Sequence, residues 1–507
     1  WRNLESSRSQ PATASYQMVQ ALVRHHISWG ILTNGRTWRL FTRRTNSIIT
    51  EFHEVDLGPL FERLYEGRTL TTSQWVMLRQ WWMLFRKDAF VTLGEGISFI
   101  DRLYENSPAR RQESRIHLRQ RIVQDVFPKL AGGFVAYRHQ RLGISSEDNE
   151  GLVSIQRASL ALLTRLLFLL VAEAKSLLPV DNPEYKPHSL SSLLSWAESC
   201  RQAGAPPNSG LYTTPRYDIL LSLLQRVNDG DSSKNLPQYG PVFFDPQTDR
   251  NHAFILEHRL SDAVVAEVLN LLQRGVDYLS LDAYELGAVL GPLLHIKLQV
   301  IDAAKGEVAL TKPDSDPGYR NSPVVPDYVA TDVVSQVLHP LMTQRGARFA
   351  DVMDRVVSLR HKLQQTLGQS SRANLQAALD RASHKACDTL LGLRVVDPAM
   401  GTGTFLLSAI DVVTDSVIEQ IQSYHDTHPD VPWHWNPVQN LLIRVRRDLA
   451  DELDRQGIEV RDQVLDDVSI MRRLIAQQCI YGVDRNPAAV DLSQISLWLR
   501  TFVPGAP

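Results

Sequence analysis

Apolar residues recur at helical spacing over most of residues 60–305, in segments such as SQWVMLRQWWMLFRKDAF and LSDAVVAEVLNLLQRGV. Apolar side chains three or four positions apart form one face of a helix, which packs against a core. The pattern therefore predicts a mainly helical region. The same spacing predicts further helices over residues 327–345 and 349–390, after a proline-rich break at 311–326.

A β-hairpin is indicated over residues 28–41, SWGILTNGRTWRLF, where two short apolar runs flank Asn34-Gly35. Asn-Gly tolerates the positive φ angles of a type I′ turn, so the pair is a strong hairpin signal. The preceding residues, TASYQMVQALVRH, have helical spacing. We therefore expect a helix followed by a hairpin.

The longest apolar run is LALLTRLLFLLVAEAKSLL, residues 160–178. A membrane-spanning helix needs about 20 largely uncharged residues. Arg165 lies within the run, and Glu173 and Lys175 follow near its end. A buried core helix is therefore favoured over a membrane span.

Composition narrows the class of protein. The chain has 507 residues, of which 43% are hydrophobic, and a formal net charge of −2. This length allows roughly three domains. The charge provides no general basic surface, so a DNA-binding face would be local or would lie outside this chain. The three cysteines have no paired spacing, which fits a reducing cytoplasm and argues against a disulfide scaffold or a zinc ribbon. The start, WRNLESSRSQ, lacks Met and a signal-peptide pattern, as expected of a chain whose beginning was not retained.

Residues 393–410, LRVVDPAMGTGTFLLSAI, have the pattern of a strand, a glycine turn and a helix. Such a turn brings a ligand close to the backbone and to the free N–H groups of the helix. The dinucleotide fingerprint GxGxxG is incomplete, because Leu406 occupies the position of the third glycine. S-adenosylmethionine carries an ammonium and a sulfonium group, so the carboxylate of Asp397 at the strand end favours this cofactor. A purely structural Gly-Thr-Gly turn is the alternative.

A second strand end supports the cofactor interpretation. The segment IYGVDRNPAAV places Asp484 after a short apolar strand, where its carboxylate could accept hydrogen bonds from both ribose hydroxyls of an adenosine. The alternative is that Asp484 belongs to a helix N-cap region, with Pro487 in the first turn. The distance of 87 residues from Asp397 to Asp484 exceeds what a simple βαβ unit needs, so we expect a helical insertion between the strands.

These motifs resemble those of a known family. DPAMGTGTFLL is similar to motif I of the DNA amino-methyltransferases. CIYGVDRNPAAVDLSQISLWL is similar to the following segment of the large adenine methyltransferases of type IIG restriction–modification enzymes and of the BREX and DISARM phage-defence systems. Four further matches are less specific than these two: RLLFLLVAEAKSLLPVDNPEY, FFDP at 243–246, YLSLDAYELGAVLGPLL and the hairpin, which resembles the end of the family's nuclease-like domain.

The resemblance implies an α/β fold with a Rossmann-like methyltransferase core, incomplete in this chain. It implies a nuclease-like remnant over 1–60, a helical domain over 61–310 and the first part of the cofactor-binding domain over 311–507. It further implies S-adenosyl-L-methionine as cofactor, double-stranded DNA and other defence-complex subunits as partners, and no membrane. The implied cofactor-binding residues are Asp397, Pro398, Ala399, Gly401, Gly403, Phe405, Asp484 and Pro326.

This chain departs from the family pattern in three places, the first of which is GAVLGPLL at 287–294, which lacks the family's Tyr-Glu. Before the helix at 327 the family has a GSYYTP-like element, whereas here Val325 precedes Pro326 and cannot donate a hydroxyl hydrogen bond. The family's Asn-Pro-Pro-Tyr tetrad, which activates the target amino group and stacks on the flipped base, is not found after residue 490. Two segments resemble this tetrad only in part. In DNPEY at 181–185, Glu184 replaces the second proline, and WNPV at 435–438 lacks the aromatic residue. We assign no catalytic residue and no metal ligand.

Three functions remain open. The favoured one is an adenine-N6 DNA methyltransferase, or its cofactor-binding portion. A methyltransferase of the same fold could act instead on RNA or protein. A subunit that binds DNA or partner proteins without turnover is the third possibility, which Val325 and the missing tetrad favour. A basic helix at 108–124 could bind phosphates, or it could be a solvated helix in which Glu113 pairs with arginines. Its arginines are Arg110, Arg111, Arg115, Arg119 and Arg121.

Overall fold

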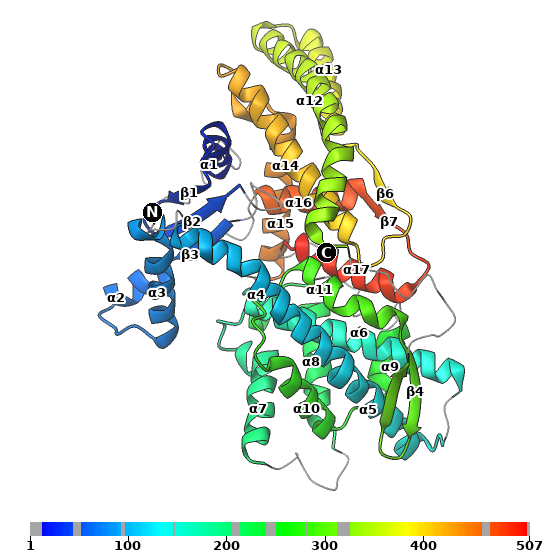
Figure 1. Ribbon diagram of the computed structural model, residues 1–507. Coiled ribbons are helices and arrows are strands. Elements are labelled where there is room, and N and C mark those ends of the chain that lie inside the picture. The colour runs from blue at the N-terminus through cyan, green and yellow to red at the C-terminus, as the bar shows by residue number, and fades with distance from the viewer. Residues whose placement is uncertain are drawn as a thin grey trace.

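The computed structural model describes residues 13–43, 52–92, 97–145, 148–204, 213–239, 250–279, 281–311, 325–458 and 467–503. Within these ranges the chain is a mixed α/β protein that is mainly helical, with three small sheets. Figure 1 shows an amino-terminal sheet at the left, a helical body below, and a long helical hairpin above the short strands β6 and β7.

The amino-terminal part is a three-stranded antiparallel sheet flanked by helices. The order in the sheet is β1-β2-β3. The elements are α1 (Thr13–Arg24), β1 (Trp29–Thr33), β2 (Thr37–Thr42), β3 (Phe52–Asp56), α2 (Gly58–Tyr65), α3 (Thr72–Phe85) and η1 (Lys87–Ala89). The helix and the hairpin predicted from the sequence are confirmed, and a third strand completes the sheet.

The turn of this hairpin differs from the predicted type I′ turn. That turn needs positive φ at both Asn34 and Gly35. Only Gly35 has it, with φ of +87°. The amide N–H of Asn34 bonds to the carbonyl of Thr37, so Gly35 and Arg36 are the central residues. The Asn34 side chain accepts hydrogen bonds from the N–H groups of Arg36 and Thr37, which holds the turn one position later than expected.

The helical body surrounds one long buried helix, α6 (Asn149–Ala174). Its helices are α4 (Phe99–Arg121), η2 (Ile122–Val126), α5 (Phe127–Leu142), α6, η3 (Lys186–His188), α7 (Leu190–Gln202), α8 (Pro215–Asp229), η4 (Ser232–Lys234), α9 (Arg250–Glu257), α10 (Asp262–Gln273), α11 (Ala283–Leu290) and η6 (Gly291–His295). A hairpin of β4 (Lys297–Asp302) and β5 (Glu307–Thr311) ends it. Among the described residues α6 alone is long and apolar enough to cross a membrane, and 83% of its most apolar window is buried. The prediction of a core helix is confirmed.

The remaining described elements form a second hydrophobic core, except for α17, which packs mainly on the helical body. They comprise α12 (Asp327–Gln365), α13 (Gln369–Leu391), β6 (Val395–Asp397), α14 (Thr404–Thr427), η7 (Trp433–Trp435), α15 (Pro437–Arg455), α16 (Asp467–Cys479), β7 (Ile480–Gly482) and α17 (Pro487–Arg500). Helix α14 directly follows the glycine turn, and α15 and α16 form the helical insertion expected between the two strands.

The predicted break between residues 345 and 349 is wrong, because α12 continues to Gln365 and the break follows at 366–368. Gly346 is buried where α12 crosses α14, and a Cβ on it would overlap the side chain of Gln420. The glycine thus permits close helix packing rather than ending the helix.

Helix α17 joins the two cores. Its Trp498 ring packs edge-on against Phe168 of α6 and Tyr239, with centroid distances of 5.0 and 5.6 Å. Leu492 and Ile495 of the same helix belong to the core of the helical body. Since α17 directly follows β7, this packing ties the second strand end to the helical body.

Candidate functional site

The two short strands lie side by side and run parallel. Val395 pairs with Ile480, Val396 with Tyr481, and Asp397 with Gly482. Parallel neighbours place their carboxyl ends at the same edge of a sheet. The prediction that the two strand ends are neighbours is therefore confirmed, although 87 residues separate Asp397 from Asp484 (Figure 1).

The turn after β6 depends on glycine. Gly401 and Gly403 have φ of +53° and +84°, a region that disfavours other residues. A Cβ on Gly401 would meet nothing within 4 Å, whereas one on Gly403 would lie 3.1 Å from Cβ of Ser493 on α17. Gly403 is also the N-cap of α14. The turn thus combines open space at Gly401 with close packing at Gly403.

Asp484 connects the second strand end to this turn. Its Oδ2 accepts a hydrogen bond of 2.9 Å from the N–H of Gly401, and its Oδ1 accepts one of 2.8 Å from the N–H of Asn486. Each carboxylate oxygen can accept a further hydrogen bond on its second lone pair. The half-buried carboxylate therefore retains the capacity to accept two hydroxyl groups while it braces the turn.

Asn486, not Asp484, is the N-cap of α17. Its side chain accepts a hydrogen bond from the N–H of Ala488, and Pro487 is the first helical residue. Asp484 is therefore not the N-cap itself, but it does belong to the N-cap region, because its carboxylate bonds to the N–H of Asn486.

The other residues that the resemblance implies as cofactor-binding differ in their exposure and in their contacts. Asp397 is half-buried at the end of β6, and its Oδ1 accepts a hydrogen bond of 3.0 Å from the N–H of Ala399. Pro398 and Ala399 are exposed beside it. Phe405, in the first turn of α14, is half-buried and packs against the second core.

In the family, the GSYYTP-like element caps the methionine end of the cofactor. Its position in this chain lies largely outside the described residues, which exclude 312–324. Pro326 is the N-cap of α12. One turn further on, the hydroxyl of Thr331 lies 3.3 Å from that of Ser408 on α14. The structure therefore brings the start of α12 beside the helix that follows the glycine turn. FFDP, at 243–246, also lies outside the described residues.

Sequence reasoning missed how α11 packs against the glycine turn. A Cβ on Gly287 would lie 2.9 Å from Cβ of Thr402, so only glycine fits this contact without displacement. Tyr284 of the same helix donates a hydrogen bond of 3.0 Å to Asp411 of α14. The glycine within YELGAVLG was the available signal, but its partner could not be read from the sequence.

Three sequence candidates have structural roles. In DNPEY, Tyr185 is buried and its hydroxyl donates to Glu173, so its ring is not free to stack on a base. In WNPV, the buried Asn436 caps α15 through the N–H groups at positions 438 and 439. In the basic helix, Arg121 donates to the carbonyls of Leu271 and Arg274 and anchors α4 to α10. The side chains of residues 106–114 lie outside the description.

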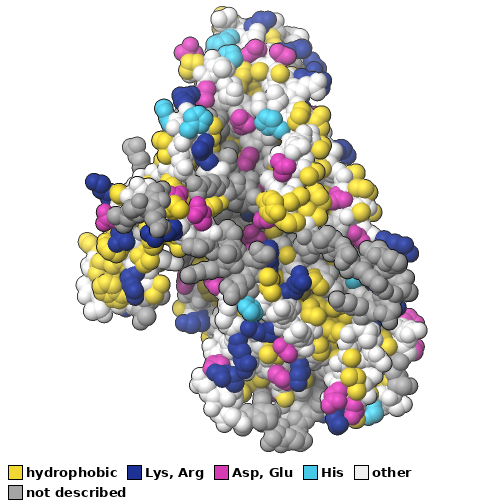
Figure 2. All heavy atoms as spheres, in the orientation of Figure 1, with side chains coloured by type: hydrophobic (Ala, Val, Ile, Leu, Met, Phe, Trp, Pro, Cys, Tyr) yellow, Lys and Arg dark blue, Asp and Glu magenta, His cyan; other side chains and the backbone are white. Residues whose placement is uncertain are grey.

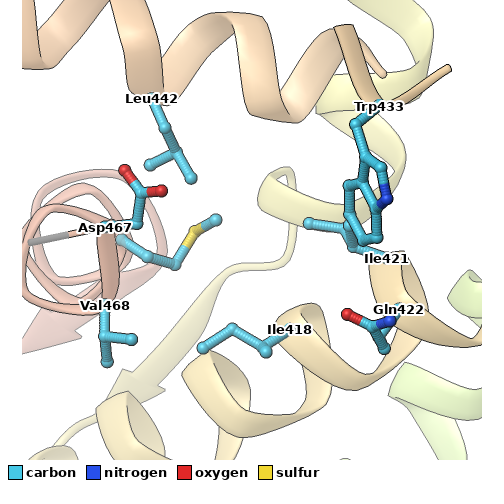
Figure 3. Close-up of a pocket in the computed structure, with 8 residues that line it drawn as sticks. Ile418, Ile421, Gln422, Trp433, Leu442, Asp467 and Val468 are labelled. Atoms are coloured by element: carbon cyan, nitrogen blue, oxygen red, sulfur yellow. The ribbon is translucent and has the colours of Figure 1, made fainter. Parts of the chain in front are cut away.

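A small, largely apolar hollow lies away from the strand ends, between α14, α15 and α16. In Figure 3, Ile418 and Gln422 lie below it and Leu442 above, with Trp433 and Ile421 together at the right and Asp467 and Val468 at the left. Asp467 is paired with Arg446. The hollow lies between α14 and the two helices of the insertion, and it includes none of the residues implied as cofactor-binding.

A buried histidine beside this hollow gives a pH-dependent prediction. The ring of His425 stacks on Trp433 at 3.8 Å, and Nδ2 of Asn436 lies 3.3 Å from its Nε2. Burial lowers the pKa of His425 to about 4, from an ordinary value of 6.5. Because the unfolded chain binds this proton more readily, stability is complete above pH 6.5 and falls as the pH decreases from 6.5 to 4.

We expect this loss to be about 2 kcal/mol, and His425→Gln to remove most of that pH dependence. Urea denaturation at several pH values between 4 and 7.5, on both proteins, measures it. Parallel curves of unfolding free energy against pH for the two proteins would refute the assignment.

Comparisons with known proteins identify no relative of this chain. No family model, no curated protein and no solved structure matches the chain.

Proposed function

We propose that this chain is an S-adenosylmethionine-dependent adenine-N6 DNA methyltransferase, or the cofactor-binding portion of one, in a bacterial restriction–modification or phage-defence system. The observation that carries the proposal is the position of Asp484. Its carboxylate lies at the common edge of two parallel strands and bonds to the backbone of the glycine turn at Gly401. An adenosine placed on that turn would have its ribose next to this carboxylate.

Charge favours the methyl donor over a dinucleotide. Two carboxylates, of Asp397 and Asp484, flank the strand ends, and they would repel a pyrophosphate and attract an ammonium or sulfonium group. Leu406 supports the same choice, since it is buried where the dinucleotide fingerprint requires a third glycine. Its Cδ1 would lie 2.6 Å from a Cβ on Gly482, so it fills the space between turn and strand.

The sheet itself supports a Rossmann-like core that extends beyond two strands. Val395 and Ile480 pack against the second core, whereas Val396, Tyr481 and Val483 are 62%, 40% and 57% exposed. Parallel sheets are ordinarily covered on both faces. An apolar outer face on this pair is what a fragment of a larger parallel sheet would have.

The reaction class depends on the resemblance of motif I and the following segment to adenine methyltransferases. A methyltransferase that acts on RNA or protein would use the same cofactor site. A subunit without turnover is the alternative that Val325 favours, because a valine offers no hydroxyl to the methionine end of the cofactor. Transfer of a labelled methyl group to duplex DNA separates these possibilities.

Calorimetric titration tests cofactor choice. We expect S-adenosylmethionine to bind the chain with a dissociation constant of about 1–100 μM, the affinity of a typical small-molecule site, and NAD⁺ to give no measurable heat. Adenosine alone should bind more weakly than the whole cofactor. Tighter binding of NAD⁺, or no heat from S-adenosylmethionine, would refute the proposal.

A further inference from the structure

Helix α3 presents a line of tryptophan and arginine side chains to solvent. Trp75, Arg79 and Trp82 are spaced four and three residues apart, which places them on one face of the helix. Arg86 is the C-cap residue of the same helix. The helix is well defined at its start, where Thr71 and Gln74 form a capping box.

A different side of α3 packs on the amino-terminal sheet. The rings of Trp81 and Phe85 both lie edge-on against Trp38 of β2, each with a centroid distance of 5.4 Å. This contact fixes the rotation of the helix. Trp75 and Trp82 therefore point outward, and each is 54% exposed.

The exposed rings are part of a larger apolar surface over α2 and α3. Figure 2 shows hydrophobic side chains gathered over these helices at the left, with basic side chains beside them. Its other exposed members are Phe61, Leu64, Tyr65, Val76 and Met83. Exposed apolar surface of this extent, rich in tryptophan, is typical of a binding site.

The charges on this face are positive and uncompensated. The guanidinium of Arg86 lies 4.4 Å from the centre of the Trp82 ring, and its buried Nε has no hydrogen-bond partner. Arg79 is exposed and, in the part of the chain that the structure describes, has no ion-pair partner. Helix α3 contains no acidic residue. A ligand for this face must therefore be anionic and must offer flat apolar groups.

We propose that the face of α3 formed by Trp75, Arg79, Trp82 and Arg86 binds single-stranded nucleic acid. Bases stack on the two indole rings, and the guanidinium groups lie against the intervening phosphates. The two rings are about 10 Å apart along the helix axis, with Arg79 between them, so ring and charge alternate as base and phosphate alternate along a strand. A duplex is a poorer fit because its base faces are covered by stacking. An acidic peptide is a poorer fit because it offers negative charge but no flat ring between the charges.

Fluorescence anisotropy with a labelled thymidine oligonucleotide of about 12 residues tests the proposal. Trp75→Ala and Trp82→Ala should each weaken binding by about 5- to 150-fold, and Trp82→Phe should retain most of it. Arg79→Ala should weaken binding and reduce the slope of log affinity against log salt by about 0.7. Tyr328→Ala, which removes a 67% exposed ring from α12, is the matched control and should bind like the unchanged chain.

Three competitors decide between ligands. An abasic strand of equal length, a blunt duplex and poly-glutamate should each compete at least ten-fold less well than the thymidine strand. Equal competition by the abasic strand or by poly-glutamate would overturn the proposal in favour of charge alone or an acidic protein partner, and equal competition by the duplex would overturn it too. So would unchanged binding by both tryptophan variants with unchanged circular dichroism. The test contains no S-adenosylmethionine, so its outcome is independent of the cofactor proposal.

Discussion

Replacement of Asp411 by alanine is expected to lower the free energy of unfolding by about 3–5 kcal/mol. Asp411 is only 1% exposed. Its carboxylate accepts hydrogen bonds of 3.0 and 2.7 Å from Nε and Nη2 of Arg500, and Nε of Arg472 lies 3.4 Å away. Removal of the carboxylate leaves two largely buried guanidinium groups without their common counter-charge. Loss of one partner of a buried ion pair is costly because the charge that remains is neither paired nor solvated.

The Asp411 cluster also holds the helices around the glycine turn together. Tyr284 belongs to α11, Asp411 to α14 and Arg500 to α17. Burial, followed by the nearby Asp411 charge, raises the pKa of Tyr284 well above its ordinary value of 10, so its hydroxyl remains a donor. We therefore expect the loss of Asp411 to loosen the turn as well as the core.

Urea denaturation followed by circular dichroism measures the change in stability. Glu267→Ala is the matched control, because Glu267 pairs with Lys129 at 3.1 Å while both side chains are half exposed. Exposed pairs contribute at most about 1 kcal/mol. Similar losses for Asp411→Ala and Glu267→Ala would show that the buried cluster has no special role.

The sequence predicted those parts of the fold that local pattern determines. The amino-terminal hairpin follows from Asn34-Gly35 between two apolar runs. The buried helix over 160–178 follows from its apolar length and from Arg165. The strand, turn and helix at 393–410 follow from two glycines that the backbone requires at positive φ.

The remainder depends on contacts between distant segments. The break expected between residues 345 and 349 does not occur, and Gly346 in this segment is explained by the approach of Gln420 on another helix. Arg121 suggested phosphate binding, yet its partners are carbonyls some 150 residues later. The Asp411 cluster brings α11, α14, α16 and α17 together, and nothing near Asp411 in the sequence indicates those partners.

In the candidate site, too, some features follow from local sequence pattern and others depend on contacts between distant segments. The presence of Asp397 and Asp484 after two short apolar strands could be predicted, because an acid that follows such a strand has a recognisable pattern. The bond from Gly401 to Asp484 and the packing of Gly287 on Thr402 could not, since each depends on the exact position of a helix.

Replacement of Asp484 by alanine is expected to weaken binding of S-adenosylmethionine by about 10- to 150-fold. Hydrogen bonds to a charged group contribute about 1.5–3 kcal/mol, and the ribose hydroxyls would both donate to this carboxylate. The variant also frees the N–H of Gly401, which relaxes the turn. Asp484→Asn retains one acceptor oxygen, so its affinity for S-adenosylmethionine should lie between that of the unchanged chain and that of Asp484→Ala.

Stability must be separated from affinity in this comparison. Asp380→Asn is the matched control, since Asp380 is an exposed acid on α13 whose carboxylate accepts one hydrogen bond from Gln376. It should bind the cofactor as the unchanged chain does. Thermal unfolding of each variant without ligand confirms that the site is folded.

Titration of S-adenosylmethionine into the unchanged chain, Asp484→Ala and Asp380→Asn, by calorimetry, therefore tests most directly whether two parallel strand ends hold this cofactor. The expected result is saturable binding to the unchanged chain and to Asp380→Asn, with affinity at least about ten-fold lower for Asp484→Ala. Equal affinity for all three folded proteins would contradict the proposed site.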